Sequence, residues 1–282
     1  MQNICPNCGA NIKFLPTIQK CYCEYCGSKI DIGEFGFCEN EINKKIEDKL
    51  KYDKYTCSAC GANLIMDENT TITECVYCGG IQIVKERFIG ELRPEALIPF
   101  KIDKNKFISI YKKFIKKKLL APNEFRQNSK SNIKGLYVPF YIYTYDTNTY
   151  ARGEAYHSGK KSYYKYFEFE LNEKIRLPQD ASLNLNDDIT TSLEPFNYDE
   201  LKEFNPAYLN GFWAEKGSED LEKINEKAKR RAQNECEDNV KRAIYRDRYC
   251  GGKMNIKLKQ LERKYVLLPI WLFNTEYKGK KY

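Results

Sequence analysis

The chain has 282 residues, 42% of them hydrophobic, and a formal net charge of +8. This composition excludes large-scale disorder, and the length allows one large domain or two modest ones. The longest apolar runs, 136–143 and 265–273, fall short of the roughly 20 residues that cross a bilayer, and the first residues lack the apolar core of a signal peptide. We therefore expect a cytoplasmic protein.

Eight of the twelve cysteines form two identical patterns near the N-terminus. Each pattern is C-x2-C-x14-C-x2-C, and the second repeats the first 52 residues later. Two residues between cysteines let a tight turn direct both sulfurs at one ion, and two such turns complete the tetrahedral thiolate shell of structural zinc. We predict two structural Zn²⁺ ions, held by Cys5, Cys8, Cys23 and Cys26 in the first ribbon and by Cys57, Cys60, Cys75 and Cys78 in the second.

Other uses of these cysteines fit the pattern less well. Iron–sulfur clusters also take four cysteines, but no cluster-type cysteine run is present. Disulfides are disfavoured because close CxxC pairs suit metal binding in a reducing compartment. With four cysteines per site no coordination position stays open, so both metals are predicted to be structural. Cys21 has a threonine, Thr73, at the equivalent position of the second pattern, so it is predicted not to be a metal ligand. Cys38, Cys236 and Cys250 are predicted to be small buried side chains.

The sequence predicts an α+β protein with four segments. Residues 1–35 form zinc ribbon 1, residues 36–55 a polar linker, and residues 56–85 zinc ribbon 2. Residues 90–282 form a basic, aromatic-rich domain with a mostly antiparallel sheet and amphipathic helices. The turn residues 278–280 have no partner strand after them, so we expect the domain to be incomplete at its C-terminus.

Periodicity predicts the elements of this second domain in chain order. A helix near 103–118 presents Phe107, Ile110, Tyr111, Phe114 and Ile115 on one face. A strand, a turn at 146–149 and a second strand follow, and then a half-buried strand from 163 to 177. Helical regions are expected at 197–204 and 206–216, a long helix at 218–246 and a final strand at 264–277.

Charge is divided unevenly along the chain. Residues 1–90 hold 10 Lys and Arg against 12 Asp and Glu, whereas residues 91–282 hold 37 against 27. Each four-thiolate zinc site adds about −2, so the ribbon half is acidic. A nucleic-acid-binding ribbon would carry positive charge to displace counterions from phosphates, so acidic ribbons favour protein partners.

The basic residues gather in the predicted helix near 103–118. Their simplest interpretation is a solvated polar face; the alternative is a surface for an anionic partner, either nucleic acid or lipid. The candidate residues are Lys112, Lys113, Lys116, Lys117 and Lys118.

Signals for catalysis are weak. The single histidine, His157, has no fixed carboxylate or cysteine partner in the sequence. The segment 153–161 departs from a phosphate-binding loop, because five residues separate its glycines and Lys161 stands where Ser or Thr should follow. The sequence therefore predicts no enzyme and no small-molecule substrate.

The chain resembles the TFIIB-type zinc-ribbon proteins of Firmicutes, which are often labelled as relatives of the primosomal helicase PriA. The resemblance rests on the two cysteine segments and on "LIPFKI", "GLYVPFYIYTYD", "SLEPFNYDELKEFNPAYLNGFWAEK" and "LLPIWLFNTEYKGKKY", which extend over nearly the whole chain. It implies a C-terminal membrane tail and a link to envelope stress proteins of the phage-shock type and to SPFH-domain scaffolds. It does not imply helicase action here, because no nucleotide-binding loop is present.

These observations give two hypotheses. The first is a non-enzymatic zinc-binding adaptor or scaffold that engages protein partners, peripheral at the inner membrane face, in the envelope stress response. The alternative is a nucleic-acid-binding protein, associated with replication or transcription, that uses the basic domain.

Overall fold

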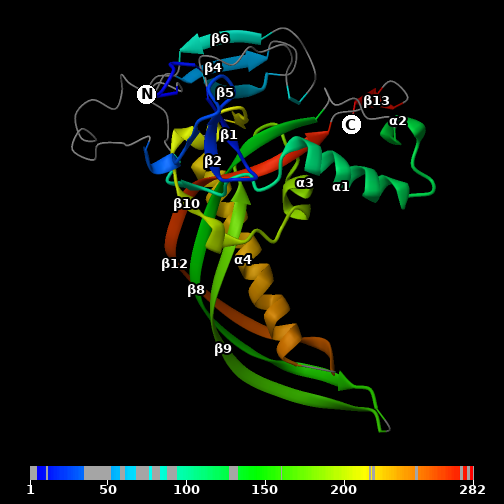
Figure 1. The fold of residues 1–282 in the computed structure, drawn as a ribbon. Coiled ribbons are helices and arrows are strands. Elements are labelled where there is room, and N and C mark those ends of the chain that lie inside the picture. The colour runs from blue at the N-terminus through cyan, green and yellow to red at the C-terminus, as the bar shows by residue number, and fades with distance from the viewer. Residues whose placement is uncertain are drawn as a thin grey trace. The chain divides into compact units, whose positions relative to one another are not determined.

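The computed structural model describes residues 5–10, 12–34, 52–57, 61–67, 76–77, 83–87, 94–126, 133–159, 161–215, 217, 220–244, 247–273, 276–277 and 280–281. The chain forms two compact units that mix strands and helices, as predicted (Figure 1). Unit 1 contains Met1–Pro139, Ser182–Gly217 and Val266–Tyr282, and unit 2 contains Phe140–Ala181 and Ser218–Tyr265. The boundaries of these units differ from the predicted ranges. Ser182–Gly217 and Val266–Tyr282 belong to the same unit as the N-terminal ribbon.

Unit 1 contains a small antiparallel sheet in the first ribbon. It consists of β1 (Ile12–Leu15), β2 (Lys20–Cys23) and β3 (Lys29–Ile30), in that order, followed by the 3-10 turn η1 (Ile32–Glu34). Alternate residues of β1 are buried, because one face of the hairpin packs on the core of the unit.

A larger sheet has the strand order β10-β7-β12-β8-β11-β5-β4-β6. Among the described strand pairs, β11 with β8 and β12 with β7 are parallel, and the other registered pairs are antiparallel, which confirms the mostly antiparallel prediction. The strands are β4 (Tyr52–Cys57), β5 (Asn63–Asp67), β6 (Ile83–Arg87), β7 (Ala96–Leu97), β8 (Ile133–His157), β10 (Lys202–Glu203), β11 (Trp213–Glu215) and β12 (Asp247–Phe273).

The helices of unit 1 are short apart from the first. The α1 helix (Lys104–Lys116) begins at Asp103, whose side chain caps the helix by accepting the N–H of Lys106 at 2.7 Å. The predicted helices at 197–204 and 206–216 are wrong: the first range contains the single turn η5 and strand β10, and the second contains the turn η6 and strand β11. The remaining elements are α2 (Asn123–Arg126), α3 (Asp187–Ser192), η5 (Tyr198–Glu200) and η6 (Pro206–Leu209).

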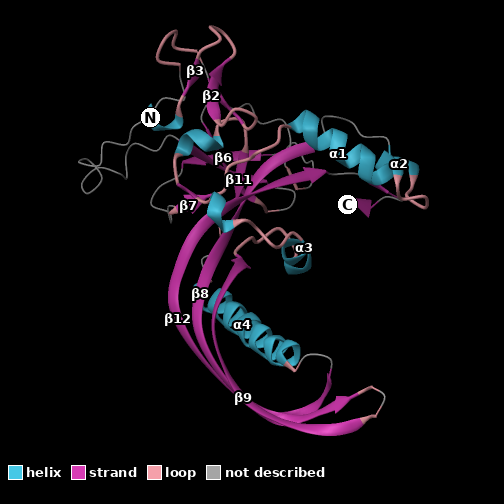
Figure 2. Cartoon of the chain, turned by 60° about the horizontal axis from the view of Figure 1, so that its bottom comes forward, coloured by secondary structure: helices cyan, strands magenta, loops and turns pink. Residues whose placement is uncertain are grey.

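Unit 2 is built from three long strands and one long helix. Residues of β8, β9 (Tyr163–Asp180) and β12 form its sheet, and α4 (Leu221–Ala243) lies against one face (Figure 2). The predicted long helix is confirmed, and α4 buries one face against tyrosines of β8 and aliphatic residues of β9. The buried helix residues are Ile224, Ala228, Ala232, Cys236 and Val240.

The turn predicted at 146–149 is wrong. β8 continues through these residues and pairs with β9 in one unbroken register, from Phe140 opposite Asp180 to His157 opposite Tyr163. The chain therefore reverses between His157 and Tyr163. Thr147 and Thr149 are buried within the strand, so the polar segment lies within the sheet and not in a turn.

Gly153 of β8 and Gly252 of β12 allow these two strands to approach closely in unit 2. A Cβ added at Gly153 would lie 2.2 Å from the carbonyl oxygen of Gly251 and 2.8 Å from the Cα of Gly252. Gly153→Ala is therefore expected to lower the free energy of unfolding by about 2 kcal/mol, because backbone must move to make room. Denaturant unfolding measures the loss. Gly33→Ala is the control, since a Cβ there meets nothing within 4 Å; an equal loss in both variants would contradict the prediction.

The last described residues form a two-stranded pair. Strand β13 (Glu276–Tyr277) pairs antiparallel with β14 (Lys280–Lys281). A partner strand for β13 is thus present, contrary to the expectation that none follows it, whereas the incompleteness of the domain stays a prediction. Within the described part of the chain, no helix combines the length and the apolar character needed to cross a membrane.

Candidate metal centre and its docking

The four cysteines of the first pattern come together in space. The sulfurs of Cys5, Cys8, Cys23 and Cys26 all lie within 4.8 Å of one another. Cys5 and Cys26 are 3.5 Å apart, as are Cys8 and Cys23, far longer than the roughly 2 Å of a disulfide. A tetrahedron with zinc–sulfur bonds of about 2.3 Å has sulfur–sulfur edges of about 3.8 Å. The cluster therefore suits a metal ion.

Both cysteine pairs lie in turns with the same backbone geometry. The Gly9 N–H donates to the Cys5 carbonyl at 2.8 Å, and the Gly27 N–H donates to the Cys23 carbonyl at 2.9 Å. Gly9 and Gly27 have φ values of 73° and 75°, a conformation that residues with a Cβ rarely adopt. The glycine after each pair therefore sets the turn that brings two sulfurs to one point.

The pKa values of two cysteines in the cluster are shifted in opposite directions. Hydrogen bonds from the side chain and backbone of Ser28 lower the pKa of Cys26 to about 6. The Ala10 backbone hydrogen bond lowers the pKa of Cys8, but desolvation and the neighbouring thiols outweigh it and raise that pKa to about 12. Four thiolates this close become stable together only when a positive ion lies among them.

The first ribbon is fixed to unit 1 by the segment around η6. The Phe14 N–H donates to the Asn210 carbonyl at 3.1 Å, and the Asn205 side chain donates to the Ile32 carbonyl at 3.2 Å. Cys21 is fully buried, and its sulfur lies 3.8 Å from the Ala207 carbonyl. The first ribbon therefore packs into the core of unit 1 and is not an independent domain.

Aromatic side chains fill the space beneath the ribbon. Phe14 meets Tyr208 edge-on with ring centroids 5.1 Å apart, and Phe100 stacks on Phe212 at 4.2 Å. Trp271 lies 5.1 Å from Phe100. Sequence reasoning assigned 206–216 to a helix and missed this role, although the density of aromatic and apolar residues in 204–213 signals a buried segment.

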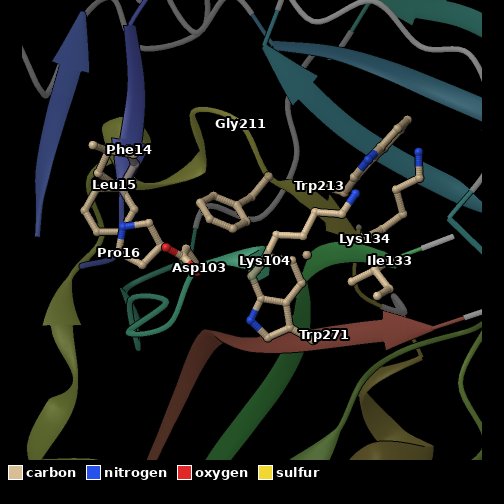
Figure 3. A pocket seen from close by; sticks show the side chains of 12 residues that line it. Phe14, Leu15, Pro16, Asp103, Lys104, Ile133, Lys134, Gly211, Trp213 and Trp271 are labelled. Atoms are coloured by element: carbon tan, nitrogen blue, oxygen red, sulfur yellow. The ribbon is translucent and has the colours of Figure 1, made fainter. Parts of the chain in front are cut away.

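A cavity of about 280 Å³ opens beside this aromatic cluster. Trp271, Trp213 and Ile133 reach it from three different strands (Figure 3). The acid in its lining, Asp103, already caps α1. The lining also includes two lysines, Lys104 and Lys134, and is otherwise mainly apolar and aromatic.

The second cysteine pattern is described only in part. Cys57 is fully buried, whereas Cys60, Cys75 and Cys78 lie outside the described residues. The turn after Cys57 repeats the geometry of the first ribbon: the Gly61 N–H donates to the Cys57 carbonyl at 2.7 Å, and Gly61 has φ of 74°. Cys57 and Gly61 thus share this hydrogen bond and this φ with the two turns of the first cluster.

The second repeat is tied to a buried carboxylate. Glu215 on β11 is 1% exposed and accepts hydrogen bonds from the hydroxyl groups of Tyr77 and Ser182. It also accepts the Leu183 N–H at 3.0 Å and the Asn184 side-chain N–H at 2.7 Å. Burial raises the pKa of Glu215 despite these four donors. No local sequence pattern indicated this acceptor, because its donors come from segments distant from Glu215 in the sequence.

Tyr77 has a counterpart in the first ribbon. The repeat offset of 52 residues places Tyr25 at the same position, between the last two cysteines of its pattern. Tyr77 is directed into the protein, toward Glu215, whereas Tyr25 is 83% exposed. Two equivalent tyrosines therefore have opposite environments.

The predicted anionic-partner residues gather at the C-terminal end of α1. Their side chains are exposed, on the last turns of the helix and in the turn that follows it: Lys112, Lys113, Lys116, Lys117 and Lys118. The predicted apolar face of α1 is partly wrong. Ile108 and Ile115 are buried, but Ile110 and Phe114 are 47% and 54% exposed.

Other candidate residues are scattered. His157 does have a carboxylate partner, because its Nδ1 lies 2.6 Å from Asp247, which sequence reasoning did not find. Cys236 is buried, as predicted, but Cys250 is exposed, so that part of the prediction is wrong. Cys38 lies outside the described residues.

No family model matches the chain, and no solved structure matches it. Over 295 residues the chain is 30% identical to a Bacillus subtilis (strain 168) protein named "Uncharacterized protein YdjG", an alignment that includes 97% of this chain and 83% of that protein. The chain therefore belongs to the YdjG family.

Proposed function

We propose that the protein is a non-enzymatic zinc-binding adaptor whose first ribbon binds a protein partner. The observation that carries the proposal is the exposed Tyr25 at the tip of the first metal cluster. An aromatic side chain on a rigid turn loses little conformational entropy on binding, and tyrosines are frequent energetic centres of protein interfaces. Its counterpart Tyr77 already makes such a contact inside the protein.

The metal is proposed to be zinc. Four cysteine ligands in a closed shell are typical of structural zinc, and such a shell leaves no coordination position for a substrate. A second zinc ion is proposed at Cys57, Cys60, Cys75 and Cys78. The shared φ of the glycines that follow Cys8 and Cys60, 73° at Gly9 and 74° at Gly61, supports this second site.

The environment of Tyr77 suggests what the partner offers to Tyr25. The Tyr77 hydroxyl donates to the Glu215 carboxylate, which is surrounded by further donors. Near Tyr25, Glu24 is paired with Lys13 at 2.9 Å, so this carboxylate already has a cationic partner within the chain. We propose that the partner presents a hydrogen-bond acceptor, most simply a carboxylate, to the Tyr25 hydroxyl.

Tyr25→Ala is expected to weaken partner binding by about 30-fold, the effect of an interface residue that contributes about 2 kcal/mol. Quantitative affinity purification from the native cell identifies the partner, and titration of the purified pair measures the dissociation constant. Tyr164→Ala is the matched control, because Tyr164 is 68% exposed but lies outside the ribbon.

The result that supports the proposal is a partner lost with Tyr25→Ala and retained with Tyr164→Ala. If both variants retain the partner equally, the interface does not include Tyr25 and the proposed role of the first ribbon is wrong. If the wild-type chain retains no protein but binds DNA tightly and in a salt-sensitive manner, the adaptor proposal fails and the nucleic-acid alternative replaces it.

A further inference from the structure

The end of α1 carries apolar side chains that point into solvent. Ile110 and Phe114 lie one helical turn apart on its outer side, and Leu119 and Leu120 follow directly after the helix. The two leucines are 89% and 98% exposed, the highest values among the large apolar residues of the described chain. We call these four residues and the five lysines among them the α1 edge.

The leucines stand on a fixed turn and not on a loose segment. The Arg126 guanidinium donates to three backbone carbonyls of this turn, at 3.1 Å to Lys118, 3.0 Å to Leu119 and 3.1 Å to Ala121. The Tyr111 hydroxyl donates to the Phe125 carbonyl at 2.8 Å, which ties α2 to α1. The α2 helix follows directly after α1 in unit 1 (Figure 1). These hydrogen bonds hold in place the turn that carries the two exposed leucines.

The charge around these leucines has one sign. Residues 104–122 contain seven lysines and no aspartate or glutamate. The five lysines nearest the leucines have exposed side chains, and the Lys118 ammonium lies 5.1 Å over the Phe114 ring. Long lysine side chains beside apolar residues are typical of proteins that lie at the boundary between lipid headgroups and acyl chains.

We propose that the α1 edge binds the surface of an anionic lipid bilayer. Leu119 and Leu120 enter the headgroup region together with Phe114, while the lysines pair with lipid phosphates. Both the leucines and the lysines are needed for this interaction. Nucleic acid would attract the lysines but would not bury the leucine side chains. Single-stranded nucleic acid would instead favour aromatic side chains on which bases stack, and the tip of this edge offers aliphatic ones.

This surface is separate from Tyr25, so each proposal can fail without the other. The interaction also differs from a membrane-spanning segment, since it is peripheral and depends on salt. Lipid binding would place the protein at a membrane face while the first ribbon remains available to a partner.

Flotation with vesicles tests the proposal on the full chain. Wild type is expected to bind phosphatidylglycerol vesicles at least tenfold more tightly than phosphatidylcholine vesicles, and less tightly as salt rises. The double variant Leu119→Ser with Leu120→Ser, and separately the variant with Lys112, Lys113, Lys116 and Lys117 changed to Glu, are each expected to lose at least tenfold. Circular dichroism verifies that both variants fold.

Matched controls separate the α1 edge from general charge or apolarity. Leu183→Ser removes a leucine that is 66% exposed elsewhere, and changing Lys253, Lys257 and Lys259 to Glu removes exposed lysines of β12. Both controls are expected to bind phosphatidylglycerol vesicles as wild type does. Equal losses in controls and test variants would overturn the proposal.

A fluorescent probe distinguishes lipid from free phosphate. Leu120→Trp is expected to show a blue-shifted emission with phosphatidylglycerol vesicles and no shift with soluble glycerol phosphate, because only a bilayer removes the indole from water. The proposal fails if wild type does not float with anionic vesicles at low salt. It also fails if the leucine variant binds as well as wild type, or if the lysine variant loses only binding to DNA.

Discussion

Removal of the metal is expected to unfold the first ribbon and to expose the aromatic core of unit 1. Structural zinc contributes about 10 kcal/mol or more to the folding of four-ligand modules, more than most domains have in reserve. Chelation at neutral pH, or Cys8→Ser, should therefore give a ribbon that proteases cleave rapidly. The Trp271 emission should shift to the red, because its neighbour Phe100 belongs to the same core as the ribbon.

Metal analysis of the purified chain measures how many zinc ions it binds. Limited proteolysis then measures how far the first ribbon unfolds when the metal is removed. Cys250→Ser is the control, because Cys250 is an exposed cysteine outside both patterns. Two zinc ions per chain are expected; one ion would show that the second pattern does not bind metal. A ribbon that keeps its protease resistance without metal would contradict the structural role of the cluster.

Glu215→Ala is expected to lower the free energy of unfolding by about 3–4 kcal/mol, since each buried donor without a partner costs about 1–3 kcal/mol and water can satisfy some of them. The variant leaves donors from Tyr77, Ser182, Leu183 and Asn184 without their common acceptor. Denaturant unfolding of the wild type and variant measures the difference. A loss below about 1 kcal/mol would show that these donors find other partners.

Glu215→Gln keeps the shape of the side chain and one acceptor oxygen, so its loss should be smaller than that of Glu215→Ala. It also removes the titration. Burial raises the pKa of Glu215 above its ordinary value of 4.5, so the folded state holds this proton more readily than the unfolded state. The stability of wild type relative to Glu215→Gln should therefore fall as the pH rises from 4.5 toward the raised pKa. If the stability of wild type relative to Glu215→Gln rises with pH over this range, the upward shift of the Glu215 pKa is contradicted.

Local patterns in the sequence predicted the local parts of the site. The spacing of Cys5, Cys8, Cys23 and Cys26 is sufficient to predict the cluster, because each pair acts within a four-residue turn. The α4 helix was equally predictable, since its buried residues recur at the helical period from Ile224 to Val240. In both cases the determining contacts lie close in the sequence or repeat along one face.

Long-range pairing decided the parts that sequence reasoning missed. The segment 146–149 has turn-forming residues, but β9 supplies a partner for every one of them, so the strand continues. His157 meets Asp247 across 90 residues, and Phe14 meets Asn210 across nearly 200. No local pattern records which distant segments come together, and the docking of the ribbon therefore could not be predicted.

The repeated tyrosine allows a direct comparison between recognition within one chain and recognition between chains. A duplicated module has one copy committed to an internal ligand, Glu215, and one copy whose equivalent side chain remains in solvent. The internal copy is thus a template for the external one. A short peptide that carries a carboxylate beside serine and asparagine side chains, as Glu215 lies beside Ser182 and Asn184, becomes a rational starting ligand for the first ribbon.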